Sequence, residues 1–328
     1  MTGQEIKNII SMLTEKPEEC GFEVYIITKS EPQLKKMGFI EKGTDNFYQK
    51  LKESIIKSLS EKYNDEEAEY VSADYIADDQ RKFYIIPISQ NYNPLPMLNT
   101  KAGTFSKNDI GDATGIAFSL RRDKNQIWVY QHLWSIMVPN KSKKNLMARL
   151  VSGERDVFEE MTDPIITFTE KCDFLVIDNN IITSDYKLLQ NSFGFQDYIR
   201  LRADKTIEAI ESKGIVAKVD KLKAYVNRGN GKPKYAKKMM RISDSKVLEM
   251  EPTKLRENIH RSTRWNGKIE EDENGKFVID TYPQVEILID LLDERYTRSD
   301  ISDTEYDTDV KRVAEPVVTG TNEKKGKM

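Results

Sequence analysis

The sequence predicts an α+β fold with an N-terminal α/β region, a central antiparallel sheet and a helical, basic C-terminal segment. Three observations support this prediction. Helical and strand-like segments alternate before residue 110, β-branched and aromatic runs joined by polar turns follow, and apolar residues recur at helical spacing after Phe195. With 328 residues the chain can bury one large core or two modest ones. We expect three parts: residues 1–110, residues 111–312 and a disordered tail at 313–328.

The first 110 residues predict two helices, two strands and a long loop. Ile6, Ile9, Ile10 and Leu13 lie on one side of an opening helix, and Thr44 is a suitable N-cap for a second helix. An Asn-, Pro- and Gly-rich stretch predicts a loop before the next region. The expected elements after the opening helix are a strand at 22–28, a helix at 44–62, a strand at 82–88 and a loop at 89–115.

The middle of the chain predicts antiparallel strands. Residues 116–120 and 126–132 flank a short polar loop, as in a hairpin. Residues 174–178 and 181–183 flank Asn179 and Asn180, and asparagine tolerates the positive φ of a tight turn. We expect the sheet to continue to about Leu189.

The last third predicts helices. Apolar side chains from Phe195 to Ile210 recur at helical spacing, and Gly214 is suited to end that helix. Asn274 and Gly275 predict a hairpin turn before a strand. The remaining expected elements are helices at 215–226, 234–242, 252–259 and 285–292 and a strand at 277–280.

The composition excludes several classes of protein. Two cysteines and two histidines, Cys20, Cys172, His132 and His260, cannot build a Cys-rich or multi-His metal centre. The sequence contains neither a Gly-rich phosphate loop nor a secretion signal, and its longest uncharged stretch is interrupted by prolines. We therefore expect a cytoplasmic protein without cofactor or metal.

The formal net charge of −3 hides a segregation of charge. Residues 200–268 contain 19 Lys and Arg against 8 Asp and Glu, a net charge of +11. Residues 269–309 contain 3 basic and 14 acidic residues, a net charge of −11. A positive block of this size is typical of a polyanion-binding surface beside an acidic one.

The cations of the positive block are arranged in stripes. Lys234, Lys237, Lys238 and Arg241 follow the spacing of one helix face, so phosphates would relieve their mutual repulsion. The alternative is a solvated face without a ligand, or a face that meets an acidic protein. The candidate DNA-binding residues are Lys218, Lys221, Arg228, Lys232, Lys234, Lys237, Lys238, Arg241, Arg261 and Arg264.

A second function is a metal-dependent nuclease. Asp178 at a strand end, followed by Asp185 and Lys187, has the Asp and Asp-x-Lys form in which carboxylates hold Mg²⁺ and a lysine activates water. Such triplets are common in a chain this charged, and a hairpin with polar ends explains the same residues.

Three segments resemble a known family. They are KNQIWVY from Lys124, CDFLVIDNNIITSDYKLLQNSFGFQDYIR, and ILIDLLDERYTRSDISDTEYDTDVKR near the C-terminus. Their isoleucine-tryptophan strand and the LLD-x-x-Y-x-x-S motif followed by Tyr306 and Lys311 resemble the KwaB-like family of the Kiwa anti-phage system, over roughly residues 115–312.

The resemblance implies a DNA-binding defence protein that restrains phage replication. It also implies at least a homodimer and a small membrane-spanning partner, KwaA, which would recruit a cytoplasmic protein to the inner face of the membrane. The resemblance assigns no individual DNA contact, so the candidate residues depend on charge and spacing alone.

Overall fold

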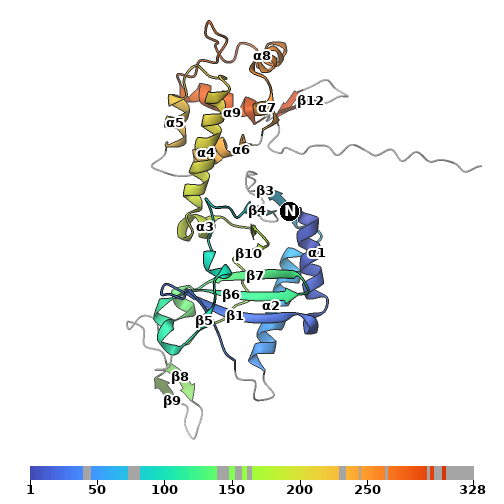
Figure 1. Cartoon of the computed structure of the whole chain (residues 1–328), viewed down its shortest axis with the longest axis vertical. Coiled ribbons are helices and arrows are strands. Elements are labelled where there is room, and N and C mark those ends of the chain that lie inside the picture. The colour runs from blue at the N-terminus through green and yellow to red at the C-terminus, as the bar shows by residue number, and fades with distance from the viewer. Residues whose placement is uncertain are drawn as a thin grey trace, which may run out of the picture. The chain divides into compact units, whose positions relative to one another are not determined.

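The computed structural model describes most of the chain in two compact units, Met1–Tyr198 and Ile199–Met328. Helices accompany a large mixed sheet, which confirms the α+β class. The sheet belongs to the first unit, and helices make up most of the second (Figure 1). The described residues are 1–39, 46–72, 82–138, 148–151, 157–160, 165–228, 234–243, 245–262, 265–293, 296–298 and 305–307.

The first unit is built on a nine-stranded sheet. Its neighbouring strands are antiparallel, except for the parallel pairs β3–β4 and β2–β5. Strands on both sides of residue 110 therefore share one sheet. In sheet order, the strands are β3 (Glu69–Ser72), β4 (Lys82–Pro87), β11 (Asn180–Thr183), β10 (Phe174–Ile177), β7 (Asn125–His132), β6 (Ala113–Arg122), β1 (Gly21–Thr28), β2 (Leu34–Lys36) and β5 (Gly103–Thr104).

Helices α1 (Gly3–Thr14) and α2 (Phe47–Tyr63) lie side by side and pack against the sheet (Figure 1). Ile6 and Ile10 of α1, Ile55 of α2 and Phe118 of β6 are buried in one core. The predicted apolar face of the opening helix is thus confirmed. Smaller elements of this unit are the 3-10 helices Pro17–Glu19, Pro96–Asn99, Lys107–Asp112 and Ser135–Met137, and the separate pair β8 (Ala148–Val151) and β9 (Val157–Glu160).

Three local predictions for the first unit need correction. Thr44 lies outside the described residues, and the side chain of Asn46 caps α2 by accepting from the backbone N of Gln49 at 3.1 Å. In the hairpin of β10 and β11 the positive φ belongs to Asp178, at 50°, because the turn lies one residue earlier than predicted. The sheet does not continue to Leu189, which is buried in helix α3 (Lys187–Ser192).

In the second unit the predicted helix after Phe195 is confirmed, and Gly214 follows its end with φ at 62°. The helix predicted from Ile215 begins only at Asp220. Residues 277–280, all of them described, form no strand, and Phe277 makes isolated bridges to Val216 and Glu271. Helix α4 (Phe195–Ser212) begins in the last residues of the first unit. The remaining elements are α5 (Asp220–Val226), α6 (Lys234–Arg241), α7 (Lys246–Glu249), α8 (Pro252–Arg261), α9 (Tyr282–Leu292), β12 (Tyr296–Arg298) and β13 (Glu305–Asp307).

Candidate functional site

Two acidic residues, Glu286 of α9 and Asp293 directly after α9, pair with two of the cations on the predicted basic face of α6. Nζ of Lys238 lies 2.5 Å from Oε2 of Glu286, and Nη2 of Arg241 lies 3.2 Å from Oδ2 of Asp293. The side chains of Arg241 and Asp293 are only 11% and 2% exposed, so this pair is a buried contact between helices. Lys234, by contrast, is exposed at the start of α6. The four cations therefore do not form one open stripe.

Glu286 joins three helices. Its carboxylate accepts hydrogen bonds from Nζ of Lys238 on α6 and from the hydroxyl of Tyr225, a buried residue of α5. Burial would raise the pKa of Glu286, but the hydrogen bonds from Lys238 and Tyr225 outweigh that effect and lower the pKa. Glu286 is thus held as a carboxylate that fixes α5 and α6 against α9.

Beside Glu286, two cations lie over tyrosine rings. The guanidinium carbon of Arg228 is 4.5 Å from the ring centre of Tyr282 and 5.4 Å from that of Tyr235. Nζ of Lys221 lies 4.8 Å from the same Tyr282 ring. Because Arg228 is exposed and the two rings are half-buried, the rings hold the guanidinium at the surface. Its N–H edge stays available to an oxygen ligand.

The other predicted DNA-binding residues have different positions. Lys218 and Arg261 are exposed, and Lys237 is half-buried on α6. Lys232 and Arg264 lie outside the described residues. The structure therefore groups Lys221, Arg228 and Lys238 around the contact of α5, α6 and α9.

The predicted nuclease residues are not brought together. Asp178 lies in the turn between β10 and β11, whereas Asp185 follows the far end of β11. The four residues of β11 separate them by roughly 13 Å, at about 3.3 Å per residue. Lys187 begins α3, and its backbone N donates to Oδ1 of Asp185 at 2.8 Å.

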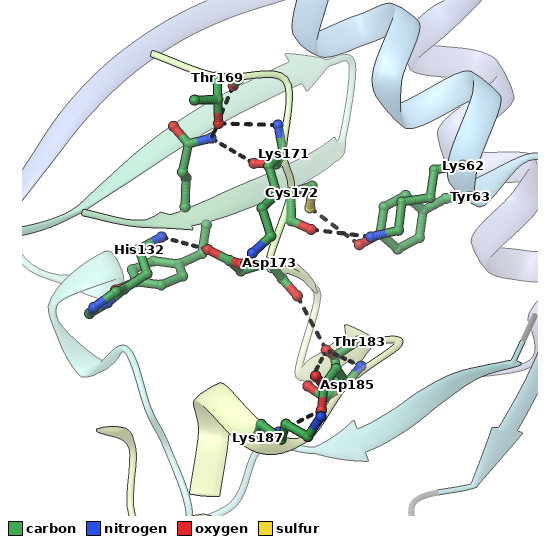
Figure 2. A network of polar contacts seen from close by, with 12 residues as sticks. Lys62, Tyr63, His132, Thr169, Lys171, Cys172, Asp173, Thr183, Asp185 and Lys187 are labelled. Carbon is green, nitrogen blue, oxygen red and sulfur yellow. Dashed lines mark hydrogen bonds and ion pairs between the residues drawn. The ribbon is translucent and has the colours of Figure 1, made fainter. Parts of the chain in front are cut away.

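Sequence reasoning missed Asp173, which lies at the same end of the hairpin as Asp185 (Figure 2). Oδ2 of Asp173 accepts from the backbone N of His132 at 2.7 Å, and Oδ1 lies 3.1 Å from Nζ of Lys171. The side chain of Asp173 is 7% exposed. The hairpin could have pointed to Asp173. Antiparallel register places residue 173, just before β10, opposite residue 184, and so next to Asp185.

Asp173, Asp185, Lys62, Lys171 and Lys187 line one pocket of about 450 Å³ in the first unit. Its wall is held by hydrogen bonds from Nζ of Lys62 to the carbonyl of Cys172 and from the hydroxyl of Tyr63 to Sγ of Cys172 (Figure 2). Burial raises the pKa of the Cys172 thiol to about 12, so this cysteine is no nucleophile. No group of three or more metal-ligating side chains occurs among the described residues.

The fold and the surface together define a class of protein: a two-unit α+β protein with cations clustered over tyrosine rings. None of the helices in the described part of the chain is long and apolar enough to cross a bilayer. No curated protein and no solved structure matches the chain.

The family model described as Kiwa protein KwaB-like matches residues 110–302. This range is more than half of the chain, so the chain belongs to the KwaB-like family, as the resemblance indicated. Membership implies a role in Kiwa anti-phage defence. The matched range begins near the end of a 3-10 helix of the first unit and continues through α9 of the second unit.

Proposed function

We propose that the protein binds phage DNA through the second unit and blocks replication or expression of that DNA. The observation that carries this proposal is Arg228, exposed and held over Tyr282 and Tyr235 beside Lys221. A guanidinium held in this way has lost part of its conformational freedom before it meets a phosphate. Lys218 and Lys234, both exposed, extend the positive surface.

The binding proposed here is largely independent of base sequence. Phosphate contacts position a protein on DNA without reading bases, and occupancy alone can obstruct a polymerase. A membrane partner similar to KwaA and a homodimer complete the proposal, which places a cytoplasmic protein at the inner face of the membrane. The Kiwa system to which the family belongs supports a partner protein.

A nuclease is not proposed, because the structure separates Asp178 from Asp185 by the length of β11. The alternative function for the same cations is to bind an acidic protein instead of DNA.

A salt titration of DNA affinity tests the proposal. If Z phosphates are engaged, log K falls linearly with log salt concentration, with a slope of about −0.9 Z for duplex DNA. We expect a steep slope for the full chain and a shallower one for Arg228→Gln. Absence of DNA binding at low salt would refute the proposal, and binding of an acidic protein in its place would favour the interaction module.

A further inference from the structure

The pocket of the first unit is lined by residues that take no part in the proposed DNA surface. It lies where β7 ends, β10 begins and β11 ends, next to the last turn of α2 and the start of α3. Its volume of about 450 Å³ falls within the range of about 300–1,000 Å³ typical of small-molecule sites. A pocket of this size accommodates a ligand larger than a single ion.

The rim of the pocket carries an exposed aromatic ring. The side chain of Trp134 is 48% exposed, one of few large apolar side chains among the described residues with such exposure. Its ring lies edge-on against His132, with ring centres 4.4 Å apart. The contact with His132 restrains the indole while its exposed surface remains available. A restrained, exposed indole is suited to stack on a planar heteroaromatic ring.

The lining of the pocket carries more positive than negative charge. Lys62, Lys171 and Lys187 line it together with only two carboxylates, Asp173 and Asp185. Lys62 and Lys171 are already oriented, the first by the carbonyl of Cys172 at 3.2 Å and the second by Asp173 at 3.1 Å. Nζ of Lys187 has no partner among the residues that the structure describes. An anion is the ligand that this lysine set favours.

Hydrogen bonds hold the backbone that forms the walls of the pocket. Nε2 of Gln131 donates to the carbonyls of Thr169 and Lys171 at 3.0 and 2.7 Å, which fixes the segment that precedes Asp173. The Thr183 hydroxyl lies 3.2 Å from the carbonyl of Asp173 and accepts from the backbone N of Asp185 at 3.1 Å. Such preorganisation lowers the entropic cost of binding.

We propose that this pocket binds a nucleotide, with its base against Trp134 and its phosphate at Lys62, Lys171 and Lys187. Asp185, Ser184 and Asn191 supply polar groups for the sugar hydroxyls and the base edge. The nucleotide is either free in solution or the 5′-terminal nucleotide of a DNA strand, since both present a ring and a terminal phosphate. The proposal is independent of DNA binding by the second unit.

Isothermal titration calorimetry of the full chain with ATP tests the pocket. We expect a Kd between about 1 μM and 1 mM for the wild type. Trp134→Ala and Lys187→Gln are each expected to weaken binding at least about tenfold, equivalent to about 1.4 kcal/mol. Adenosine alone and inorganic phosphate alone are expected to bind more weakly than ATP, because each fills one half of the site.

One control variant separates this pocket from other exposed lysines. Lys57→Gln changes a lysine of the same helix as Lys62 that pairs with Glu61 outside the pocket. It is expected to leave ATP affinity unchanged. Trp134 and Lys187 are partly exposed, so their variants should keep the wild-type melting temperature. If Trp134→Ala failed to fold, Lys187→Gln would still decide the question.

A competition experiment distinguishes the two sources of the nucleotide. A 5′-phosphorylated thymidine tetranucleotide that displaces ATP, and does so better than its unphosphorylated form, identifies a DNA end as the ligand. ATP binding without displacement identifies a free nucleotide. The proposal is overturned if neither probe binds at millimolar concentration, or if ATP affinity is the same in wild type, Trp134→Ala and Lys187→Gln.

Discussion

The guanidinium carbon of Arg228 lies 4.5 Å from the ring centre of Tyr282. This contact joins the second residue after α5 to the first turn of α9. Tyr282 follows Thr281, whose side chain and that of Gln284 form a capping box that fixes the start of α9. The ring is thus set by a helix end, and the cation is set by the ring. Cation–π contacts at exposed sites contribute about 0.5–1 kcal/mol, enough to orient an arginine without burying it.

Arg228→Lys is expected to weaken DNA binding, although it keeps the positive charge. Lysine keeps the charge but loses the flat contact with Tyr282 and the two-pronged hydrogen-bonding edge. We expect a loss of about two- to fivefold, from about 0.5–1 kcal/mol of lost contact. Tyr282→Leu should reduce DNA affinity by the same factor, and Tyr282→Phe, which retains the ring, should leave DNA affinity unchanged.

A double-mutant cycle of these two residues supplies the control. If Arg228 acts through Tyr282, the loss in the double variant Arg228→Lys with Tyr282→Leu is smaller than the sum of the two single losses. Additive losses in fluorescence anisotropy would show that the two side chains act separately.

Lys234 and Lys238 differ in their partners although they are one helical turn apart. Lys234→Gln is expected to reduce the slope of log K against log salt by about 1, as for an exposed phosphate contact. Lys238→Gln is expected to leave that slope unchanged and to lower the stability of the second unit by about 1–2 kcal/mol, because Glu286 loses a charged hydrogen-bond partner. Paired salt titrations and urea unfolding separate the two effects. Equal slopes in both variants would place Lys238 on the DNA surface.

The stability contributed by Glu286 is expected to depend on pH. Its folded-state pKa is lowered from 4.5, so the unfolded chain binds the proton more readily than the folded one. The stabilisation is therefore complete well above pH 4.5 and is lost as the pH falls through the lower folded pKa. Melting curves should show Glu286→Gln less stable than wild type at pH 7 and equally stable at strongly acidic pH. A difference that stayed constant with pH would show that the charge of Glu286 contributes nothing.

Asp178 is expected to act as a turn residue and not as a metal ligand. Because its φ is 50°, Asp178→Val should lower the stability of the first unit by about 1–2 kcal/mol, whereas Asp178→Gly should be neutral or slightly stabilising. Denaturant unfolding measures both changes. The purified chain with Mg²⁺ should also leave plasmid DNA intact, and nicking that Asp178→Gly abolishes would contradict this assignment.

Local sequence signals predicted most elements, because helical period and turn chemistry act within a few residues. The apolar period of α1 and the glycine after α4 are examples. The predictions that failed concern positions where tertiary contacts decide. Residues after Thr183 have strand-like composition, yet Tyr186 packs against Tyr84 and Phe195 and the chain turns into α3.

In the candidate site, too, the sequence predicted local features and missed the contacts made by tertiary structure. The site's cations could be found from their spacing along the sequence. Their partners could not be found, because Glu286 and Asp293 are about 50 residues away from Lys238 and Arg241 in the chain. The pocket was missed for the same reason, since Lys62, Trp134 and Lys187 are brought together only by the sheet and α2.

The sequence by itself determined the α+β class, the family and the segregation of charge into a positive and a negative block. Tertiary structure decided which charges remain exposed. Helix α9 of the negative block packs against α5 and brings Glu286 and Asp293 to Lys238 and Arg241 of α6, while Arg228 and Lys234 remain at the surface. The reason is physical: a charge that is partly buried requires an opposite charge beside it, whereas an exposed charge is solvated by water.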